Sequence, residues 1–265
     1  LGMSIGVMPR STVGYSTSSA KTITESYSHA ADVIATSSYK GEGGLHEVYL
    51  GAGWMPCRYF SVGANVGYVW GSIDHLSSIT YNDASIASSA RKYESRIRTY
   101  DVNVGLQGYI PMGKNDRLTL GATYTLGHDV NNTADMMVST DTVHAEKAFQ
   151  TPHTIGAGFS WEHHGRLRVA ADYELQKWGD CRYPWLTIDN KGNETYASAK
   201  GWLRASPRFA LGIEYRPLKK GSHWREYVTY RCGLAVTTPY ADVAKPGTSA
   251  MDKGPTSYLA TAGVN

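Results

Sequence analysis

Long stretches of the chain alternate apolar and polar residues with a period of two, and this pattern constrains the fold more than any other feature. In segment 169–176 one side of an extended chain carries Val169, Ala171, Tyr173 and Leu175, and the other carries Ala170, Asp172, Glu174 and Gln176. Successive side chains of a strand point to opposite faces, so this alternation predicts strands that separate two environments. It recurs in segments 62–70, 100–110, 118–126, 154–162, 209–215 and 228–236. We therefore expect an all-β, antiparallel fold.

The polar face of these strands distinguishes a membrane barrel from a soluble sandwich. Soluble sheets expose a face rich in Lys and Glu, whereas here the second face is mostly Gly, Ser, Thr and Asn, and charged residues make up only 18% of the chain. Small side chains suit the crowded interior of a barrel. The 19 tyrosines and 7 tryptophans, against 4 phenylalanines, suit two interfacial girdles, and several fall near strand ends: Trp54, Trp70, Tyr100, Trp161 and Tyr215. We interpret the chain as a transmembrane β-barrel of the bacterial outer membrane.

The connections alternate between short and long, as in outer-membrane barrels. Short turns are expected at 55–58, 112–116, 163–166 and 218–222, and longer polar stretches at 76–92, 128–148 and 179–198. No stretch approaches the roughly 20 apolar residues of a membrane helix. The segmentation predicts about ten strands: 2–15, 20–40, 44–55, 60–74, 93–111, 117–130, 146–162, 166–179, 199–217 and 225–243, with a turn at Gly41–Gly44.

Three stretches resemble the FadL/TodX family of outer-membrane transporters, particularly divergent members in Bacteroidota. They are Phe60–Gly71, Asp116–Thr125 and Arg208–Pro217, the last followed by Tyr227–Leu234 and Thr238–Tyr240. The resemblance implies a barrel of about 14 strands when complete, an N-terminal plug, and passive diffusion of hydrophobic molecules through the wall. On this basis residues 1–265 are expected to form a single barrel domain in which the plug and the closing strands are absent.

Polar and charged residues on the second face are the candidate ligand-binding residues, as the lining of the lumen. They are Asn65, Asn103, Gln107, Asp172, Glu174, Glu214, Arg216 and Arg231. If this face points inward, the two arginines are placed to pair with carboxylates on neighbouring strands. Two interpretations follow: internal ion pairs that hold the barrel rigid, or a polar lining for a ligand path. Replacing Arg231 by a neutral residue distinguishes them, through heat stability in the first case and permeability in the second.

Other chemistry is sparse, and we expect no enzyme, no cofactor and no metal. The run Glu162-His163-His164, with His153 nearby, lacks the spacing of known metal motifs, and adjacent side chains on a strand point to opposite sides, so a polar turn is the simpler interpretation. Cys57, Cys181 and Cys232 are far apart in this topology, which predicts free thiols. No acid, base and nucleophile converge in the sequence.

Three functions remain open. The first is a passive outer-membrane transporter for small hydrophobic molecules, and the second is a non-transporting barrel subunit of a larger outer-membrane protein complex. The third is a soluble all-β binding protein such as a lectin or propeller. The expected partners are the lipid bilayer and lipopolysaccharide, with hydrophobic small molecules or other outer-membrane proteins according to the function. The net charge of +3 is too small and too dispersed to indicate nucleic acid.

Overall fold

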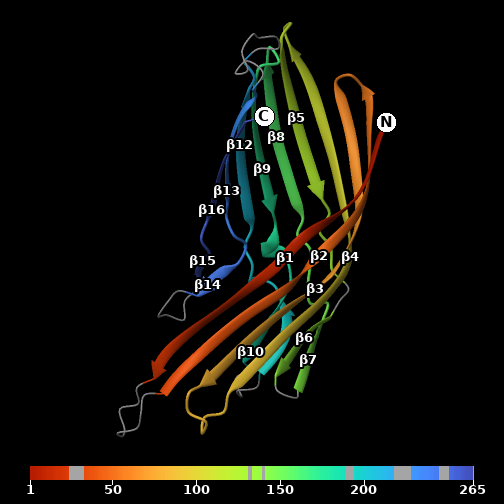
Figure 1. Cartoon of the computed structure of the whole chain (residues 1–265). Helices are drawn as coiled ribbons and strands as arrows, with labels where there is room; N and C mark the ends of the chain where they lie inside the picture. The colour runs from red at the N-terminus through yellow and green to blue at the C-terminus, as the bar shows by residue number, and fades with distance from the viewer. Residues whose placement is uncertain are drawn as a thin grey trace.

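One antiparallel sheet dominates the computed structural model, which describes residues 1–23, 33–130, 133–138, 141–188, 194–217, 228–244 and 251–264. Ten strands pair in the order β1-β2-β3-β4-β5-β8-β9-β12-β13-β16. The sheet curls into a half-barrel (Figure 1). Its strands are β1 (Gly2–Ile23), β2 (Val33–Cys57), β3 (Phe60–Tyr81), β4 (Ser89–Met112), β5 (Asp116–Thr125), β8 (Thr154–His163), β9 (Leu167–Gln176), β12 (Ser206–Tyr215), β13 (Tyr230–Thr237) and β16 (Ser257–Val264).

This architecture confirms the predicted all-β antiparallel fold and the number of about ten strands. Tight turns join β2 to β3, β4 to β5, and β8 to β9, at three of the four expected positions. The fourth expected turn, 218–222, lies outside the described residues. Within the described residues, the regular helical structure is a single 3-10 turn, η1 (Trp178–Asp180), and no helix is long and apolar enough to cross a membrane.

The predicted division of the first part of the chain into three strands, 2–15, 20–40 and 44–55, is wrong, because the structure has two long strands there, β1 and β2. The predicted turn at Gly41–Gly44 lies in the middle of β2, where it pairs with both β1 and β3. Two glycines explain the error. Gly43 (φ 114°) and Gly71 (φ 153°) have positive backbone angles, and a Cβ on either would collide with a backbone carbonyl of the neighbouring strand, that of Ser72 or Gly44. These glycines therefore mark a close approach of β2 and β3 within the sheet rather than a reversal of the chain.

The long polar stretches also contain more strand than expected. Strands β3 and β4 run through much of 76–92, and hairpins form from β6 (Thr133–Val138) with β7 (Asp141–Glu146) and from β10 (Tyr183–Ile188) with β11 (Glu194–Ala199). A short pair, β14 (Asp242–Ala244) with β15 (Met251–Lys253), lies between β13 and β16. Strand β6 continues the sheet by pairing with the start of β4, so the backbone groups of this loop are paired.

A small apolar core forms where β6 and β7 meet β4. Its buried members are Ala134, Met136, Ala145 and Ala148, and the side chains packed against it are Tyr93, Val143 and Phe149. The sequence prediction treated this stretch as a polar loop because short alternating runs such as Ala134-Asp-Met136 carry a weak signal. The core gives the long-loop end of the sheet a fixed structure of its own.

The three cysteines are free, as predicted. Cys57 is exposed at the end of β2 and Cys232 is exposed on β13, whereas Cys181 is buried after η1. Burial raises the pKa of the Cys181 thiol to about 11.

Candidate functional site

The strand register divides the sheet into an apolar face and a polar face. Rows of directly paired residues on one face are apolar, for example Leu120–Phe159–Ala171–Leu211–Leu234–Ala260 across six strands. Many large apolar side chains of this face are exposed, among them Leu50 (54%), Val66 (56%) and Leu234 (60%). The other face buries Glu47 and Val69 to 4% and 5% exposure, so we assign it to the concave side of the curl. We call the two faces outer and inner.

Aromatic side chains border the outer face at two levels. Tyr68 stacks on Trp70 with ring centroids 5.9 Å apart, and Tyr100 stacks on His128 with centroids 3.9 Å apart, midway along the long strands β3 and β4 on the side of the long connections. Trp54 and Trp161 lie toward the opposite end, with the short turns. The outer face therefore has the apolar band and aromatic borders that a bilayer selects.

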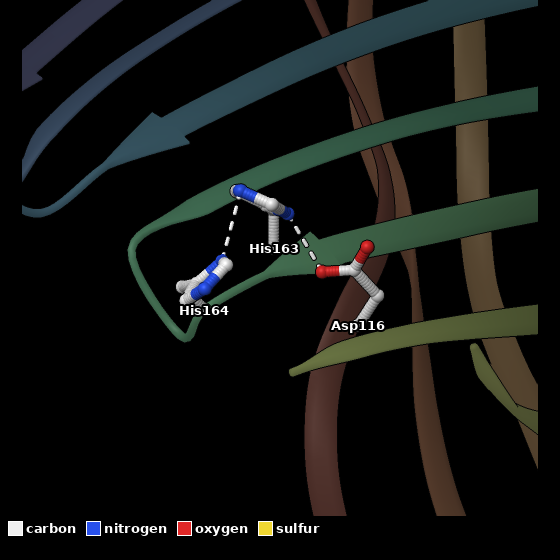
Figure 2. Close-up of side chains that lie close together, drawn as sticks. All are labelled: Asp116, His163 and His164. Atoms are coloured by element: carbon white, nitrogen blue, oxygen red, sulfur yellow. Dashed lines mark hydrogen bonds and ion pairs between the residues drawn. The ribbon is translucent and has the colours of Figure 1, made fainter. Parts of the chain in front are cut away.

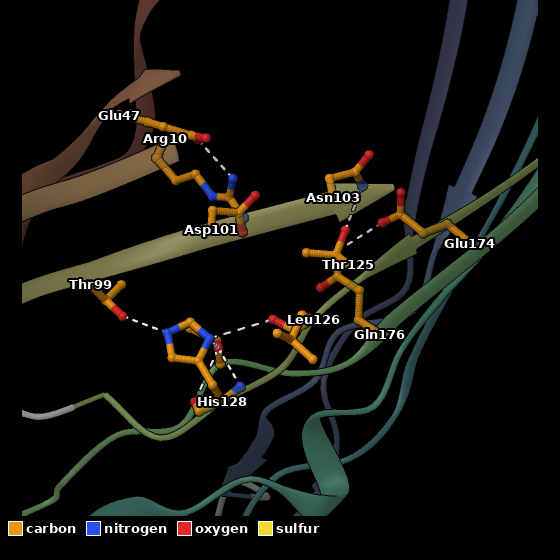
Figure 3. A network of polar contacts seen from close by, with 11 residues as sticks. Arg10, Glu47, Thr99, Asp101, Asn103, Thr125, Leu126, His128, Glu174 and Gln176 are labelled. Atoms are coloured by element: carbon orange, nitrogen blue, oxygen red, sulfur yellow. Dashed lines mark hydrogen bonds and ion pairs between the residues drawn. The ribbon is translucent and has the colours of Figure 1, made fainter. Parts of the chain in front are cut away.

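A continuous polar row crosses the inner face of eight strands. It runs Ser4–Gly51–Asn65–Asn103–Thr125–Thr154–Gln176–Ser206, each residue directly opposite the next. The Asn103 side-chain amide donates to Thr125 Oγ1 at 2.7 Å (Figure 3), and the Gln176 amide donates to Glu174 Oε1 at 2.8 Å. The first of these hydrogen bonds links β4 to β5, and the second lies within β9.

The register places seven of the eight predicted site residues on this inner face, and the eighth, Arg216, follows the end of β12 and contacts Glu214. The structure does not bring the eight together. Asn65, Asn103 and Gln107 line one open hollow of about 600 Å³. Asp172 and Glu174 lie on β9, further around the curl, and Glu214, Arg216 and Arg231 lie at the short-turn end. The set is therefore spread along the wall instead of forming a pocket.

At the short-turn end the predicted pair of Arg231 with a carboxylate on the neighbouring strand forms, whereas Arg216 contacts Glu214 in its own segment. The charges there alternate from strand to strand as a ladder. Directly paired inner residues on five neighbouring strands read Arg117–Glu162–Arg168–Glu214–Arg231. Glu162 accepts from Arg117 at 3.2 Å and from Arg168 at 3.0 Å, and Glu214 binds Arg231 at 2.8 Å and Arg216 at 3.6 Å. Opposite charges directly across strands stabilise a sheet. The ion pairs join β5, β8 and β9 in one group and β12 and β13 in another, near their turns.

A second ionic group, which sequence reasoning missed, lies on the inner face at the level of Tyr68 and Trp70. Arg10 binds Glu47 at 2.7 Å and Asp101 at 3.0 Å, so one guanidinium joins β1, β2 and β4 (Figure 3). Arg10 reaches them because the pairing of β1 with β2 shifts between Pro9 and Ser11 and leaves Arg10 without a directly opposite residue. Proline lacks an N–H for the ladder and marks such bulges. Pro9 within an alternating strand was therefore the available signal.

The histidine run is resolved into three separate environments. Glu162 joins the inner ladder, and His153 lies at the other end of β8, where its Nδ1 is 2.7 Å from the Tyr124 hydroxyl. The side chains of His163 and His164 do not point to opposite sides. Their ring centroids lie 4.1 Å apart, beside Asp116 (Figure 2). Sequence reasoning assumed strand geometry at a position that is in fact a turn.

Comparison with known proteins places these features in a family. The model of the BamG family matches residues 1–245. Among curated proteins no sequence matches. Two solved structures share the fold: the toluene transporter TbuX of Ralstonia pickettii (13% identity, 91% of this chain and 79% of that one, TM-score 0.52) and the deltaS2S3 mutant of the monoaromatic hydrocarbon channel TodX (14%, 99% and 80%, TM-score 0.53). At such identities the likeness establishes the barrel fold alone, and it agrees with the predicted FadL/TodX resemblance at that level.

Proposed function

The chain belongs to the BamG family, and on that basis we propose that it is a non-transporting β-barrel subunit of a Bam-related protein complex in the bacterial outer membrane. The observation that carries the proposal is the match of the family model to residues 1–245, nearly the whole chain. This was the second of the functions left open by the sequence. It makes other envelope proteins the partners, together with lipid and lipopolysaccharide around the outer face.

The outer face supports the membrane location. Contiguous apolar patches larger than a few hundred Å² are rare on soluble proteins and mark surfaces that meet a membrane or a partner. Here apolar rows cross the whole sheet between the aromatic borders described above. A soluble lectin or propeller would hide such rows in its core.

The inner face supports a role without transport. Sites for hydrophobic molecules are lined mainly by apolar and aromatic side chains. The middle rows of the inner wall instead present glycines, hydroxyls and amides, for example Gly53–Gly63–Gly105–Thr123–Gly156. The ladder at the short-turn end adds charges that are already paired. Such a lining stabilises the wall and offers an apolar solute little favourable contact.

The long-loop end provides surfaces on which a partner can dock. Strands β1 to β4 continue beyond the aromatic border, and β6 extends the pairing from β4 (Figure 1). Hydrogen-bonded strands hold their shape better than single loops do, which lowers the entropy lost on association. A subunit that organises other proteins benefits from such a preformed surface.

The decisive experiment is recovery of the native chain from bacterial envelopes in mild detergent, with quantitative mass spectrometry of the proteins that accompany it. We expect stoichiometric recovery with other envelope proteins. Photo-crosslinkers placed at Leu50 and Leu234 on the outer wall, at Ser85 in the β3–β4 connection, and at Lys114 in a short turn then locate the docking surface. A lone heat-modifiable band without crosslinks would contradict the proposal, and recovery without detergent would contradict the barrel itself.

Passive transport of hydrophobic molecules is the second candidate, favoured by the fold shared with two hydrocarbon-transporting proteins. Uptake of labelled toluene by cells with and without the protein tests it directly. Our proposal predicts that toluene uptake is the same in cells with and without the protein, provided that other outer-membrane proteins are shown to assemble normally in both. In the transport case, the eight predicted site residues named above remain the proposed lining.

A further inference from the structure

We infer that His163 and His164, supported by Asp116, form a binding site for one divalent transition-metal ion of the zinc, copper and nickel class. The three side chains lie at two neighbouring turns, one between β4 and β5 and one between β8 and β9 (Figure 2). Within the described part of the chain, they are the one group of three His, Cys, Asp or Glu side chains whose ligand atoms all lie within 4.8 Å of one another. The inference is independent of the proposed function.

The backbone of the turn explains why two adjacent histidines face each other. His164 has φ 53°, in the left-handed region that non-glycine residues rarely adopt, and Gly165 follows with φ 66°. This conformation ends the alternation of β8 and swings the second ring back over the first. The His164 backbone N–H donates to the carbonyl of Asn115 at 2.9 Å, which clamps the two turns together.

The hydrogen bonds define a consistent chain of donors and acceptors. His163 Nδ1 lies 2.6 Å from Asp116 Oδ1, His163 Nε2 lies 2.8 Å from His164 Nδ1, and His164 Nε2 lies 3.0 Å from the Asn115 amide nitrogen. The carboxylate can only accept, so His163 carries its proton on Nδ1 and presents a lone pair at Nε2. Without metal, that lone pair accepts the Nδ1–H of His164, which in turn accepts from Asn115.

A metal ion can replace the proton between the two rings. A tetrahedral ion with bonds of about 2.0–2.1 Å holds two nitrogens roughly 3.3 Å apart. The 2.8 Å separation therefore has to widen by about half an ångström, and both rings have to turn so that the two nitrogens point at the ion and not at each other. The His164 proton moves to Nε2, where the Asn115 side chain can rotate to accept it through Oδ1. Asp116 then holds the Nδ1–H of a metal-bound His163, the carboxylate–histidine arrangement that orients imidazole ligands.

The surroundings leave room for further ligands. The His163 side chain is 43% exposed and Asp116 27%, and His164 is exposed. Water or a group from a partner can complete the coordination. Neutral imidazole ligands suit zinc, copper and nickel better than they suit calcium or magnesium.

Metal titration of the full-length chain in detergent tests the inference. The protein is purified with a tag that contains no histidine, treated with a chelator, and titrated with Zn²⁺, Cu²⁺ and Ni²⁺ in separate calorimetric experiments. We expect one saturable ion per chain. Removing either nitrogen ligand, by His163→Gln or His164→Asn, should weaken binding by more than roughly tenfold, and Asp116→Asn by roughly 10–100-fold, the usual effect of losing such a partner. Asparagine is chosen at position 164 because it tolerates φ > 0.

His144 offers a matched control. It pairs with Asp135 at 2.7 Å, the same chemistry as His163 with Asp116 but without a second histidine. His144→Gln should leave the metal affinity unchanged. For Cu²⁺, electron paramagnetic resonance should show two coupled imidazole nitrogens in the wild type and one in His164→Asn. Each variant is first shown to keep its heat-modifiable mobility. Absence of saturable binding for all three ions, or unchanged affinity in folded His163→Gln, would overturn the inference.

Discussion

The sheet has two regions that differ in the length of their strands and in the structure of the connections beyond them. Strands β1 to β4 are 22, 25, 22 and 24 residues long, whereas β5, β8, β9 and β12 have 10 residues each. Ten residues match the 9–11 that a tilted strand needs to cross a bilayer. In the proposed bilayer-spanning arrangement the first region continues as a sheet beyond the membrane. In the second region the connections fold into two hairpins, β6–β7, which pairs with β4, and β10–β11.

The difference shows what the extra length requires. Beyond the proposed bilayer nothing selects for an apolar outer face. Two other features stabilise the long region: the ion pairs of Arg10 with two carboxylates, and the glycines at which β2 and β3 approach each other. The short region has its ion pairs at the opposite end, beside the turns. Three substitutions test whether these features hold the two regions as described.

The largest effect is expected from Gly71→Val in the long region. A side chain there collides with the carbonyl of Gly44 and has to adopt an unfavourable φ, so we expect a destabilisation of about 3 kcal/mol or more. The measurement is the urea midpoint of unfolding in detergent. Gly14→Val on β1 is the matched control, because a Cβ there meets nothing within 4 Å. Equal midpoints for the two variants would refute the close approach of β2 and β3.

An intermediate effect is expected from Arg10→Met. The Glu47 side chain is only 5% exposed, and losing its partner leaves a buried carboxylate; a destabilisation of about 2–3 kcal/mol is expected. The double variant Arg10→Met/Glu47→Met should recover the part of the loss that comes from the buried Glu47 carboxylate, whereas Asp101, which is 16% exposed, still lacks its partner. Lys40→Met serves as control, since its pair with Glu42 is exposed on both sides and exposed pairs of this kind contribute little to stability. A loss no greater than that of the control would mean that Arg10 does not hold the long region.

The smallest effect is expected from Arg231→Gln in the short region. The Arg231 side chain is 51% exposed and Glu214 retains Arg216. The free energy of unfolding of the barrel, followed through its heat stability, should therefore fall by less than about 1 kcal/mol. Toluene permeability should not change. The reverse result, altered permeability at unchanged stability, would make the inner face a ligand path. Arg96→Gln, in an ion pair of the projecting part of β4, is the control for loss of one charge.

The alternation was sufficient to predict much of the fold. Residues such as Leu120, Phe159 and Leu211 were placed on one face from their spacing alone, and the register puts them in one row. The pairing of Arg231 with a carboxylate on the next strand was also foreseen, because Glu214 and Arg231 have the right parity on consecutive strands. The side of a strand on which a residue lies does not reveal which residue it faces on the next strand. The position of Arg208 opposite Glu174 and the full ladder were therefore not predicted.

Other errors came from local signals whose meaning depends on neighbours. Gly41–Gly44 has the composition of a turn, and only the approach of β3 shows why glycine is needed within a strand. The hairpin β6–β7 has little alternation of its own and is stabilised by pairing with β4. The facing rings of His163 and His164 depend on one backbone angle, that of His164.

The sequence by itself therefore determined the class of fold, the two faces of the wall and the approximate number of strands, because side-chain alternation with period two is a local property of an extended chain. The tertiary structure alone decided which strands are long and which are short, which charges meet and where two histidines converge. Those outcomes depend on register, bulges and turns, in which a shift of a single residue exchanges the partners of every side chain on a strand.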